Sequence, residues 1–313
     1  MNSNNKFLMQ EVVKASNLEK NYVSKKQSVN AVKNVSFSIA EGELFGIIGP
    51  DGAGKTSLFR MLTTLLLPDA GVASVAGFDI VKDYKEIRKI VGYMPGRFSL
   101  YQDLTVKENL EFFATIFNTT VEANYELIKN IYQQIEPFAD RKAGKLSGGM
   151  KQKLALSCAL IHRPTVLFLD EPTTGVDAVS RKEFWEILKH LKSEGITILV
   201  STPYMDEAGL CDRVALMHHG SLLKTDTPAN IISQFNLPLL AAKSSNMFAL
   251  LNTLRSSSMV KDVYPFGEYH HVILHDEKQR KTFSDQLTAS MDDLEISFPQ
   301  PNIEDCFINM IAH

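Results

Sequence analysis

Gly49-Pro50-Asp51-Gly52-Ala53-Gly54-Lys55-Thr56 is the stretch that decides the fold. The apolar run 44–48 before it is typical of a strand, and the run 57–62 after it is typical of a helix. Glycines let backbone N–H groups close on phosphate oxygens, and the helix N-terminus points its partial positive charge at the same anion. The stretch therefore predicts a P-loop, in which Lys55 reaches the terminal phosphates and the Thr56 hydroxyl holds Mg²⁺.

A second motif places two carboxylates after an apolar run. Val166-Leu167-Phe168-Leu169 suits a buried parallel strand, and Asp170-Glu171 follows it directly. Ligand sites of open α/β sheets lie at the carboxyl ends of the strands, so we expect this acid pair beside the P-loop. Asp170 is then a candidate Mg²⁺ ligand, and Glu171 a candidate to orient or deprotonate an attacking water.

A third motif predicts another anion-binding surface. Leu146-Ser147-Gly148-Gly149-Met150 precedes a helical run from Lys151 to Ile161. Ser147 and the two glycines would lie at the N-terminus of that helix, where free amides favour an anion. One chain thus carries two phosphate-binding surfaces.

Alternating strand and helix patterns predict a mostly parallel sheet with a helical insertion. Strands are expected near 35–39, 44–48, 165–169 and 196–201, and a polar stretch from Ser24 to Ser28 suits a hairpin loop. Thr105 to Glu108 suits a capping box ahead of a helix, and residues 98–163 are expected to be mostly helical. An apolar stripe on 184–191 predicts a further helix closed by Gly195.

The pattern changes after about residue 230. Strands are expected at 237–242, 260–264, 271–274 and 294–298, and helices at 248–254 and 282–289. That β-α-β-β-α-β order fits a small ferredoxin-like appendage. The expected domains are therefore 10–230 and 236–313.

Composition excludes several classes of protein. The 313 residues carry a net charge of −3 without a basic stripe, so nucleic acid is not an expected partner. Cys158, Cys211 and Cys306 stand far apart, as expected of buried reduced thiols in a cytosolic protein. The polar start 1–6 and the short apolar run 7–9 argue against a signal peptide, and no apolar run approaches the roughly 18 residues that span a bilayer. A pore, if one is used, must come from another chain.

These motifs, in this order, resemble the ATP-binding subunit of ABC transporters over residues 10–230. Gly49 to Thr56 is similar to the Walker A motif, Leu146 to Met150 to the signature, and Leu167 to Glu171 to Walker B. The resemblance implies a P-loop NTPase fold of the ABC type, class α/β: a mostly parallel core sheet, an antiparallel β subdomain, a helical subdomain at about 98–163 and a small α+β C-terminal appendage.

The resemblance also implies the ligands and their residues. In this family two nucleotide domains meet head to tail, and each ATP, with Mg²⁺, lies between the Walker A of one and the signature of the other. By this comparison the nucleotide contacts are Gly49 to Thr56 together with Tyr22, Ser57, Ser147, Gly148, Gly149 and Asp177 of the D-loop. Tyr22 would stack on adenine, although a half-buried packing aromatic explains it too. Lys55 and Glu171 would be catalytic, and Thr56 and Asp170 would hold the metal.

The sequences of three segments are similar to those of the ATP-binding subunits of bacterial exporters for drugs, antibiotics or polymers. They are 101–110, 204–208 and the tail 301–307. The resemblance implies a separate membrane permease as partner, a homodimer or a heterodimer with a second ABC ATPase domain, and a cytoplasmic position on the inner face of the cell membrane.

Two positions depart from the family. Gly96 stands where the family usually has a glutamine that touches Mg²⁺ and the attacking water, and Pro203 stands where it usually has a histidine that contacts the γ-phosphate. Proline cannot donate a backbone hydrogen bond. The possible substitutes are Gln102, Arg97, His218 and His219, each of which also has an ordinary surface explanation.

We expect ATP binding to survive, because Lys55, Thr56, Asp170 and Glu171 all remain. We expect hydrolysis to be slow, because losing a positioned donor costs on the order of 10²–10³ in rate. The leading prediction is an ATPase subunit of an exporter with a degenerate pocket. A non-hydrolysing, ATP-gated regulatory or scaffold subunit is the alternative. A third hypothesis is an ABC ATPase that acts on ribosomes or DNA. Such proteins usually carry tandem nucleotide domains or long coiled coils, whereas this chain has one Walker A motif and no sustained heptads.

Overall fold

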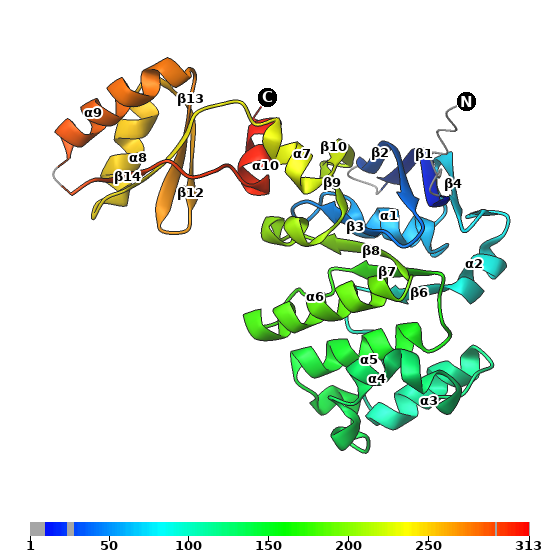
Figure 1. Ribbon diagram of the computed structural model, residues 1–313. Helices are drawn as coiled ribbons and strands as arrows, with labels where there is room; N and C mark the ends of the chain where they lie inside the picture. The colour runs from blue at the N-terminus through cyan, green and yellow to red at the C-terminus, as the bar shows by residue number, and fades with distance from the viewer. Residues whose placement is uncertain (1–9, 24–27, 292, 313) are drawn as a thin grey trace, which may run out of the picture. The chain divides into compact units, whose positions relative to one another are not determined.

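The computed structural model describes residues 10–23, 28–291 and 293–312, which form two compact units that meet in sequence between Pro228 and Ala229 (Figure 1). This description does not include residues 1–9, for which the sequence argued against a signal peptide. It also leaves out positions 24–27 of the predicted hairpin loop. Ser28, expected in that loop, is instead the first residue of a strand. Within the described ranges no helix combines the length and hydropathy needed to cross a bilayer.

The first unit is built from strands, α-helices and short 3₁₀ turns. Its strands are β1 (Glu11–Val23), β2 (Ser28–Ala40), β3 (Leu44–Ile48), β4 (Ala70–Val75), β5 (Phe78–Asp79), β6 (Val91–Met94), β7 (Val166–Asp170), β8 (Thr197–Thr202), β9 (Arg213–His218) and β10 (Ser221–Asp226). Its α-helices are α1 (Lys55–Leu62), α2 (Tyr84–Ile90), α3 (Val106–Ile116), α4 (Tyr125–Tyr132), α5 (Gly148–Leu160) and α6 (Ala178–Ser193). The 3₁₀ turns are η1 (Glu122–Asn124), η2 (Glu136–Phe138), η3 (Ala143–Lys145) and η4 (Met205–Leu210).

The core sheet has the order β10-β9-β3-β8-β7-β6, and all neighbouring strands except β10 and β9 run parallel. Every residue of β3, β7 and β8 is buried, including the polar residues of β7 and β8, as is usual for the central strands of a parallel sheet. Ile48 pairs with Thr202, and Asp170 pairs with Ser201, so the carboxyl ends of β3, β8 and β7 lie level with one another. This edge of the sheet carries the site.

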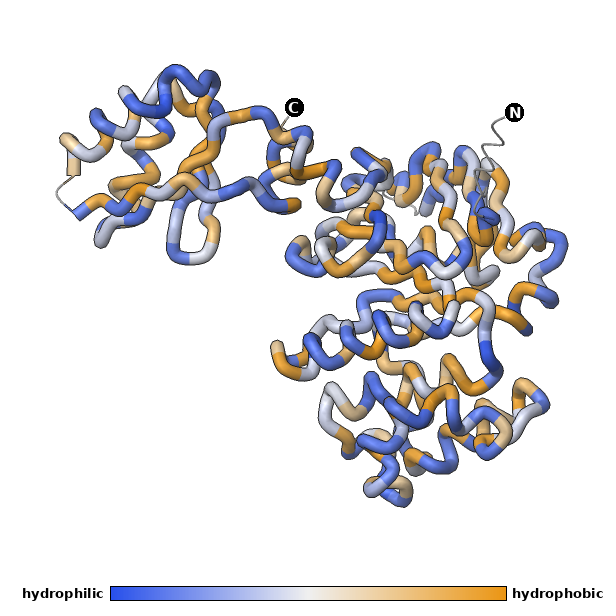
Figure 2. Tube along the Cα trace, in the orientation of Figure 1, coloured by the Kyte–Doolittle hydropathy of each residue, from blue (hydrophilic) through white to orange (hydrophobic). Residues whose placement is uncertain are grey.

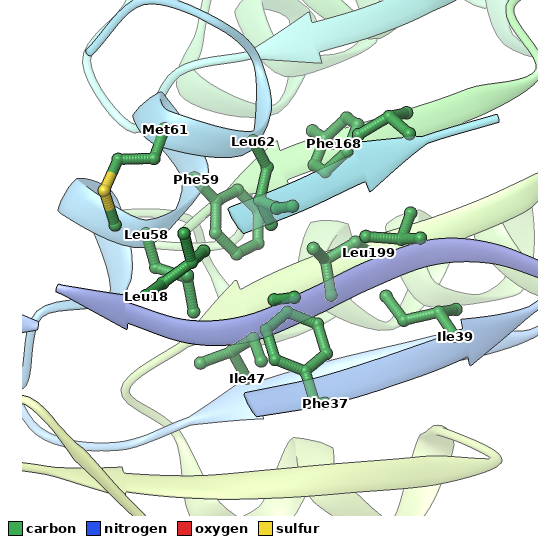
Figure 3. Packing of buried hydrophobic residues seen from close by; sticks show 14 of the residues in the cluster. Leu18, Phe37, Ile39, Ile47, Leu58, Phe59, Met61, Leu62, Phe168 and Leu199 are labelled. Carbon is green, nitrogen blue, oxygen red and sulfur yellow. The ribbon is translucent and has the colours of Figure 1, made fainter. Parts of the chain in front are cut away.

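A second, antiparallel sheet has the order β2-β1-β4-β5. Its inner face packs on β3 and α1 through one cluster of buried side chains, in which Phe37 of β2 stacks on Phe45 and Phe59 of α1 meets Phe168 edge-on (Figure 3). Contacts of this kind bury large aromatic surfaces and hold α1 in a fixed position. The parallel core and the antiparallel β subdomain confirm the predicted fold class.

Helices α3, α4 and α5 form the predicted helical subdomain, grouped at the end of the first unit opposite β1 and β2 (Figure 1). The capping box before α3 is confirmed: the Thr105 hydroxyl accepts from the Glu108 amide, and the Glu108 carboxylate accepts from the Thr105 amide. Gly195 has a positive φ and follows α6, as predicted for a helix stop.

The second unit begins with α7 (Pro228–Ser233) at the unit boundary and ends with α10 (Ile303–Ile311). Between them lie β11 (Leu239–Lys243), α8 (Met247–Ser256), β12 (Val260–Phe266), β13 (Tyr269–Leu274), η5 (Glu277–Gln279), α9 (Arg280–Ser290) and β14 (Glu295–Ser297). The sheet order β12-β13-β11-β14, antiparallel throughout, is the arrangement of a ferredoxin-like unit. Helix α10 was not anticipated from the sequence.

Hydrophobic residues alternate with hydrophilic ones along the helices of both units, as expected when each helix buries one face (Figure 2). All three cysteines are free and buried, and their burial confirms that part of the prediction. Burial raises the pKa of the Cys158 and Cys211 thiols, so neither is an activated nucleophile.

Candidate functional site: a P-loop facing two acids

The glycine-rich loop joins the buried strand β3 to α1 and has no room for a side chain at Gly49 or Gly54. Gly54 adopts φ 109°, and a Cβ on it would collide with the Ala31 carbonyl oxygen. A Cβ on Gly49 would collide with the carbonyl oxygen of Met217. Only glycine fits both positions, so the loop backbone is held tightly between β2 and β9.

Lys55 is the first residue of α1, and its ammonium is held inside the loop. Its Nζ donates to the carbonyl oxygens of Gly49 at 2.7 Å and Pro50 at 3.1 Å, and it lies 3.0 Å from Oε1 of Glu171. Lys55 is almost completely buried. A buried cation with three oxygen neighbours is fixed in position and orientation.

Asp170 ends β7 directly opposite the start of α1. Its Oδ1 accepts from the Ser201 hydroxyl at 2.7 Å and from the Thr56 hydroxyl at 3.2 Å. Burial raises the pKa of the Asp170 carboxyl above its ordinary value and adjacent Glu171 adds to this, while the two hydroxyl bonds oppose it. The residue types and contacts suit an oxygen-ligand site for Mg²⁺ between Thr56 and Asp170.

Glu171 follows β7 with a positive φ of 52°, which is uncommon for a residue with a side chain. Its amide donates to both the carbonyl and the hydroxyl of Ser201, each at 3.0 Å. Its carboxylate is partly exposed and pairs with Lys55. The acid pair predicted from the sequence thus lies beside the P-loop.

These groups surround an open pocket of about 230 Å³. It is lined by Ala31, Gly52, Ala53, Gly54, Lys55, Thr56, Ser57 and Glu171. Tyr22 of β1 lies at its border, because its hydroxyl is 3.2 Å from the Ser57 hydroxyl. Its side chain is 41% exposed, which leaves the ring available for stacking. Pro50 lends a carbonyl to Lys55, and Asp51 is exposed beside the pocket.

The predicted second phosphate surface begins α5. Ser147 is the N-cap residue, and its hydroxyl accepts from the Met150 amide at 3.4 Å. Ser147 and Gly148 are exposed, and the first turn of a helix carries amides that have no intrahelical partner. Asp177 caps α6 by accepting from the amides of Val179 and Ser180. The structure therefore gives Asp177 a local structural role, whatever else it contacts.

The two departures from the family lie at the site. Gly96 is so close to β7 that a Cβ would stand 2.9 Å from the Asp170 carbonyl oxygen. Pro203 directly follows β8. Of the proposed substitutes, Gln102 has its backbone carbonyl bonded to the Gly144 amide, and Arg97, which directly follows Gly96, is exposed. The turn carrying His218 and His219 touches the P-loop through the amide of Gly220, which donates to the Ala53 carbonyl at 2.9 Å.

Two buried elements of the site were missed in the sequence. One is Ser201, which contacts both acids. The other is Glu207, whose Oε2 accepts from the hydroxyls of Thr202 and Thr173. Ser201 belongs to no glycine-rich or acidic motif and enters the site only through the pairing of β8 with β7, and the available signal for it was a polar residue closing an otherwise apolar strand. Glu207 lies in the segment 204–208 already singled out, and its contact with Thr202 comes from the turn η4 that follows β8.

Fold and site together define an ATPase cassette of the ABC class. Residues 32–174 match the family model described as ABC transporter. The chain belongs to the family of ABC transporter ATP-binding proteins.

Three curated relatives illustrate the family. The chain is 40% identical over 287 residues to a probable multidrug ABC transporter ATP-binding protein, YbhF of Escherichia coli, covering 90% of this chain and 49% of that protein. It is 40% identical to the Nod factor export ATP-binding protein I of a Rhizobium species, covering 65% and 68%. It is 39% identical to the ABC transporter ATP-binding protein NatA of Bacillus subtilis, covering 64% and 84%. The chain spans about half the length of the YbhF proteins it matches.

Solved structures agree with the fold. The dimeric, post-hydrolysis ATP-binding cassette MJ0796 bound to ADP and Pi superposes with a TM-score of 0.63 at 27% identity, covering 69% of this chain and 98% of that one. CbiO1 from Clostridium perfringens, part of the cbiONQ transporter complex, gives 0.62 at 27% identity, covering 72% and 91%.

Proposed function

We propose that this chain is the ATP-binding subunit of an ABC-type exporter and couples ATP binding and hydrolysis to a separate membrane permease. The observation that carries the proposal is the meeting of Lys55, Thr56, Asp170 and Glu171 at one edge of the core sheet. Export is supported by the names of relatives, which include a probable multidrug transporter protein and Nod factor export proteins.

The residues present fit ATP and Mg²⁺. Among the described residues, the oxygen neighbours of the buried Lys55 ammonium are two backbone carbonyls and Glu171, and a phosphate oxygen would be a stronger partner than the neutral carbonyls. The amides at the start of α1 lack intrahelical partners, as at every helix N-terminus. Thr56 and Asp170 offer the oxygen ligands that Mg²⁺ prefers, and the bound metal would draw charge from the phosphate oxygens.

The proposed roles follow from these positions. Lys55 and the loop amides of residues 49–57 hold the phosphates, and Tyr22 stacks on the adenine. Glu171 orients the attacking water and accepts its proton. Ser147, Gly148, Gly149 and Asp177 would act across a dimer, on the ATP held by the Walker A of a second ATPase domain.

We propose further that the chain's own pocket hydrolyses ATP slowly. Gly96 has no side chain to reach the water, and Pro203 has no imidazole for the γ-phosphate. Each missing donor is worth on the order of 10²–10³ in rate. The intact signature of α5 would instead complete the site of a competent partner domain. The alternative arrangement is a homodimer in which both pockets hydrolyse ATP slowly.

The permease would dock in an apolar groove of about 300 Å³ between β6 and helices α3 and α5. Leu65, Leu100, Phe113 and Phe117 line this groove, which reaches Pro95 next to Gly96. A permease bound here would place the chain on the inner face of the cell membrane. We also propose that residues 10–230 form the nucleotide-binding domain and 236–313 a separate C-terminal domain.

The test measures ATP affinity and steady-state turnover on one purified sample. We expect ATP to bind with Mg²⁺ present and turnover to be at least about 10²-fold below that of a complete ABC site. Lys55→Met is the negative control and should lose binding. No ATP uptake at millimolar nucleotide would overturn the proposed function, and ordinary turnover by the isolated chain would overturn the slow pocket alone.

A non-hydrolysing, ATP-gated regulatory or scaffold subunit is the second candidate. Gly96 and Pro203 favour it, whereas Glu171 beside Lys55 argues against it. Tight binding with no turnover, alone or with a partner domain, would select this alternative.

A further inference from the structure

Ser201 lies at the centre of the acid pair. It is fully buried on β8 and stands opposite Asp170 in the parallel register. Its hydroxyl donates to Oδ1 of Asp170 at 2.7 Å and accepts from the amide of Glu171 at 3.0 Å. One side chain therefore contacts the carboxylate of the first acid and the backbone of the second.

The Glu171 backbone needs such support. A positive φ of 52° in a residue with a Cβ is strained and persists only where neighbouring contacts fix it. The Ser201 carbonyl and hydroxyl both accept from the Glu171 amide, and the Glu171 carbonyl accepts from the Thr174 amide at 3.2 Å. These bonds fix the backbone conformation of Glu171 and therefore the direction in which its side chain projects.

The Asp170 carboxylate is fixed by the same hydroxyl. Ser201 and Thr56 both donate to Oδ1, so the carboxylate plane is set relative to the Thr56 hydroxyl. Groups that hydrogen-bond to metal ligands orient them, and their loss typically weakens metal affinity or activity 10–100-fold.

We propose that Ser201 is a positioning residue that orients the Mg²⁺-binding carboxylate of Asp170 and the backbone of Glu171 together. The inference rests on the proposed function, in which Asp170 and Thr56 hold the metal of a bound nucleotide. Ser201 itself touches neither nucleotide nor water in this scheme.

Ser201→Ala tests the inference, with ATP titrated once with Mg²⁺ and once with EDTA. The variant should lose most of the factor by which Mg²⁺ tightens ATP binding, with affinity in EDTA within about twofold of wild type. Turnover should fall about tenfold or more. Ser201→Thr keeps a hydroxyl and should retain the wild-type Mg²⁺ factor.

Thr197→Val is the matched control. Thr197 is a buried hydroxyl residue at the other end of β8, where it accepts from the Gly42 amide at 2.9 Å. Its loss removes a buried hydrogen bond from the same strand away from the acid pair, so it should leave the Mg²⁺ factor unchanged. Titration separates folding from binding, because misfolded molecules lower the number of sites and not the dissociation constant.

Four results overturn the inference. Equal weakening with and without Mg²⁺ would make Ser201 merely structural. Wild-type behaviour of Ser201→Ala would remove its role. No Mg²⁺ effect in the wild type would remove the metal assignment itself, while failure of the wild type to bind ATP would overturn the proposed function as well.

Discussion

Pro203 stands in a loop whose neighbours are fixed on both sides. The Thr202 hydroxyl donates to the buried Glu207 carboxylate and accepts from the Tyr204 amide at 3.1 Å. The Arg181 guanidinium lies 4.6 Å from the centre of the Tyr204 ring. The loop is therefore held by residues other than Pro203, and a different side chain at 203 would project from a similar backbone.

We expect Pro203→His to raise ATP turnover about tenfold or more, because it returns a donor for the transferring charge. Pro203→Ala, which removes the ring without adding a donor, should leave turnover unchanged. Steady-state hydrolysis at saturating Mg²⁺-ATP checks both. A histidine variant no faster than the alanine variant would show that the slow step lies elsewhere.

Gly96→Gln should fail to restore turnover. A Cβ at this position would stand 2.9 Å from the Asp170 carbonyl oxygen, so β7 or the loop must shift to admit any side chain. Gly96→Ala introduces the same contact without the amide and is the matched variant. Both should lose thermal stability in parallel, and a glutamine variant faster than wild type would contradict this steric argument.

Residues within local motifs could be predicted from the sequence, and residues brought together by strand pairing could not. Lys55 and Thr56 follow from the loop that contains them, and Asp170 and Glu171 from the strand before them. Ser201 lies 31 positions beyond Asp170 and becomes part of the site only when β8 pairs with β7. No spacing rule in the chain encodes that register.

Helix α10 shows what the sequence can and cannot predict about a single secondary-structure element. Asn302 and Asp305 form a capping box with the same spacing as Thr105 and Glu108, although aspartate replaces glutamate at its fourth position. The same Asp305 is fully buried and accepts from the Tyr264 hydroxyl at 2.6 Å, with Nδ1 of His271 2.7 Å away. The sequence contains the cap, but only the fold shows that the cap also fastens α10 to β12 and β13.

We expect this cluster to make the second unit sensitive to acid. Burial alone would raise the pKa of Asp305, but hydrogen bonds from His271, Tyr264 and the Asn302 amide outweigh it and hold the pKa below its ordinary value of 3.8. A lowered carboxyl pKa stabilises the folded state above about pH 4, and this stabilisation is lost as pH falls through the folded value. Hydrogen exchange of α10 between pH 3 and 6 measures it.

Asp305→Asn is the matching variant. It should destabilise the second unit by about 1–3 kcal/mol at neutral pH, since the buried neighbours lose a charged acceptor. The variant should also reduce the loss of hydrogen-exchange protection in α10 as the pH falls from 6 to 3. Unchanged pH dependence in Asp305→Asn would show that a group other than Asp305 controls the acid response.

At the scale of the whole molecule, the sequence predicts the class of fold and leaves open how copies or partners combine. The strand and helix patterns predicted both the parallel core and the β-α-β-β-α-β order of the second unit, because apolar periodicity reflects which faces are buried. The chain has a Walker A pocket with two altered positions and an exposed, intact signature on α5. Whether the Walker A pocket or the signature on α5 contributes to catalysis depends on the ATPase domain with which this chain pairs.

A membrane complex isolated through a tag on this chain can tell the two surfaces apart. If a competent partner domain supplies the active Walker A, Ser147→Arg should abolish ATP turnover, because a long charged side chain would block the amides that the partner's nucleotide requires. Glu171→Gln, which affects only this chain's own pocket, should then reduce turnover by less than about half. ATP binding by the isolated chain should survive Ser147→Arg, since Lys55 and the P-loop are untouched. The reverse pattern, with Glu171→Gln abolishing turnover and Ser147→Arg tolerated, would assign hydrolysis to this chain's own pocket and refute the paired arrangement.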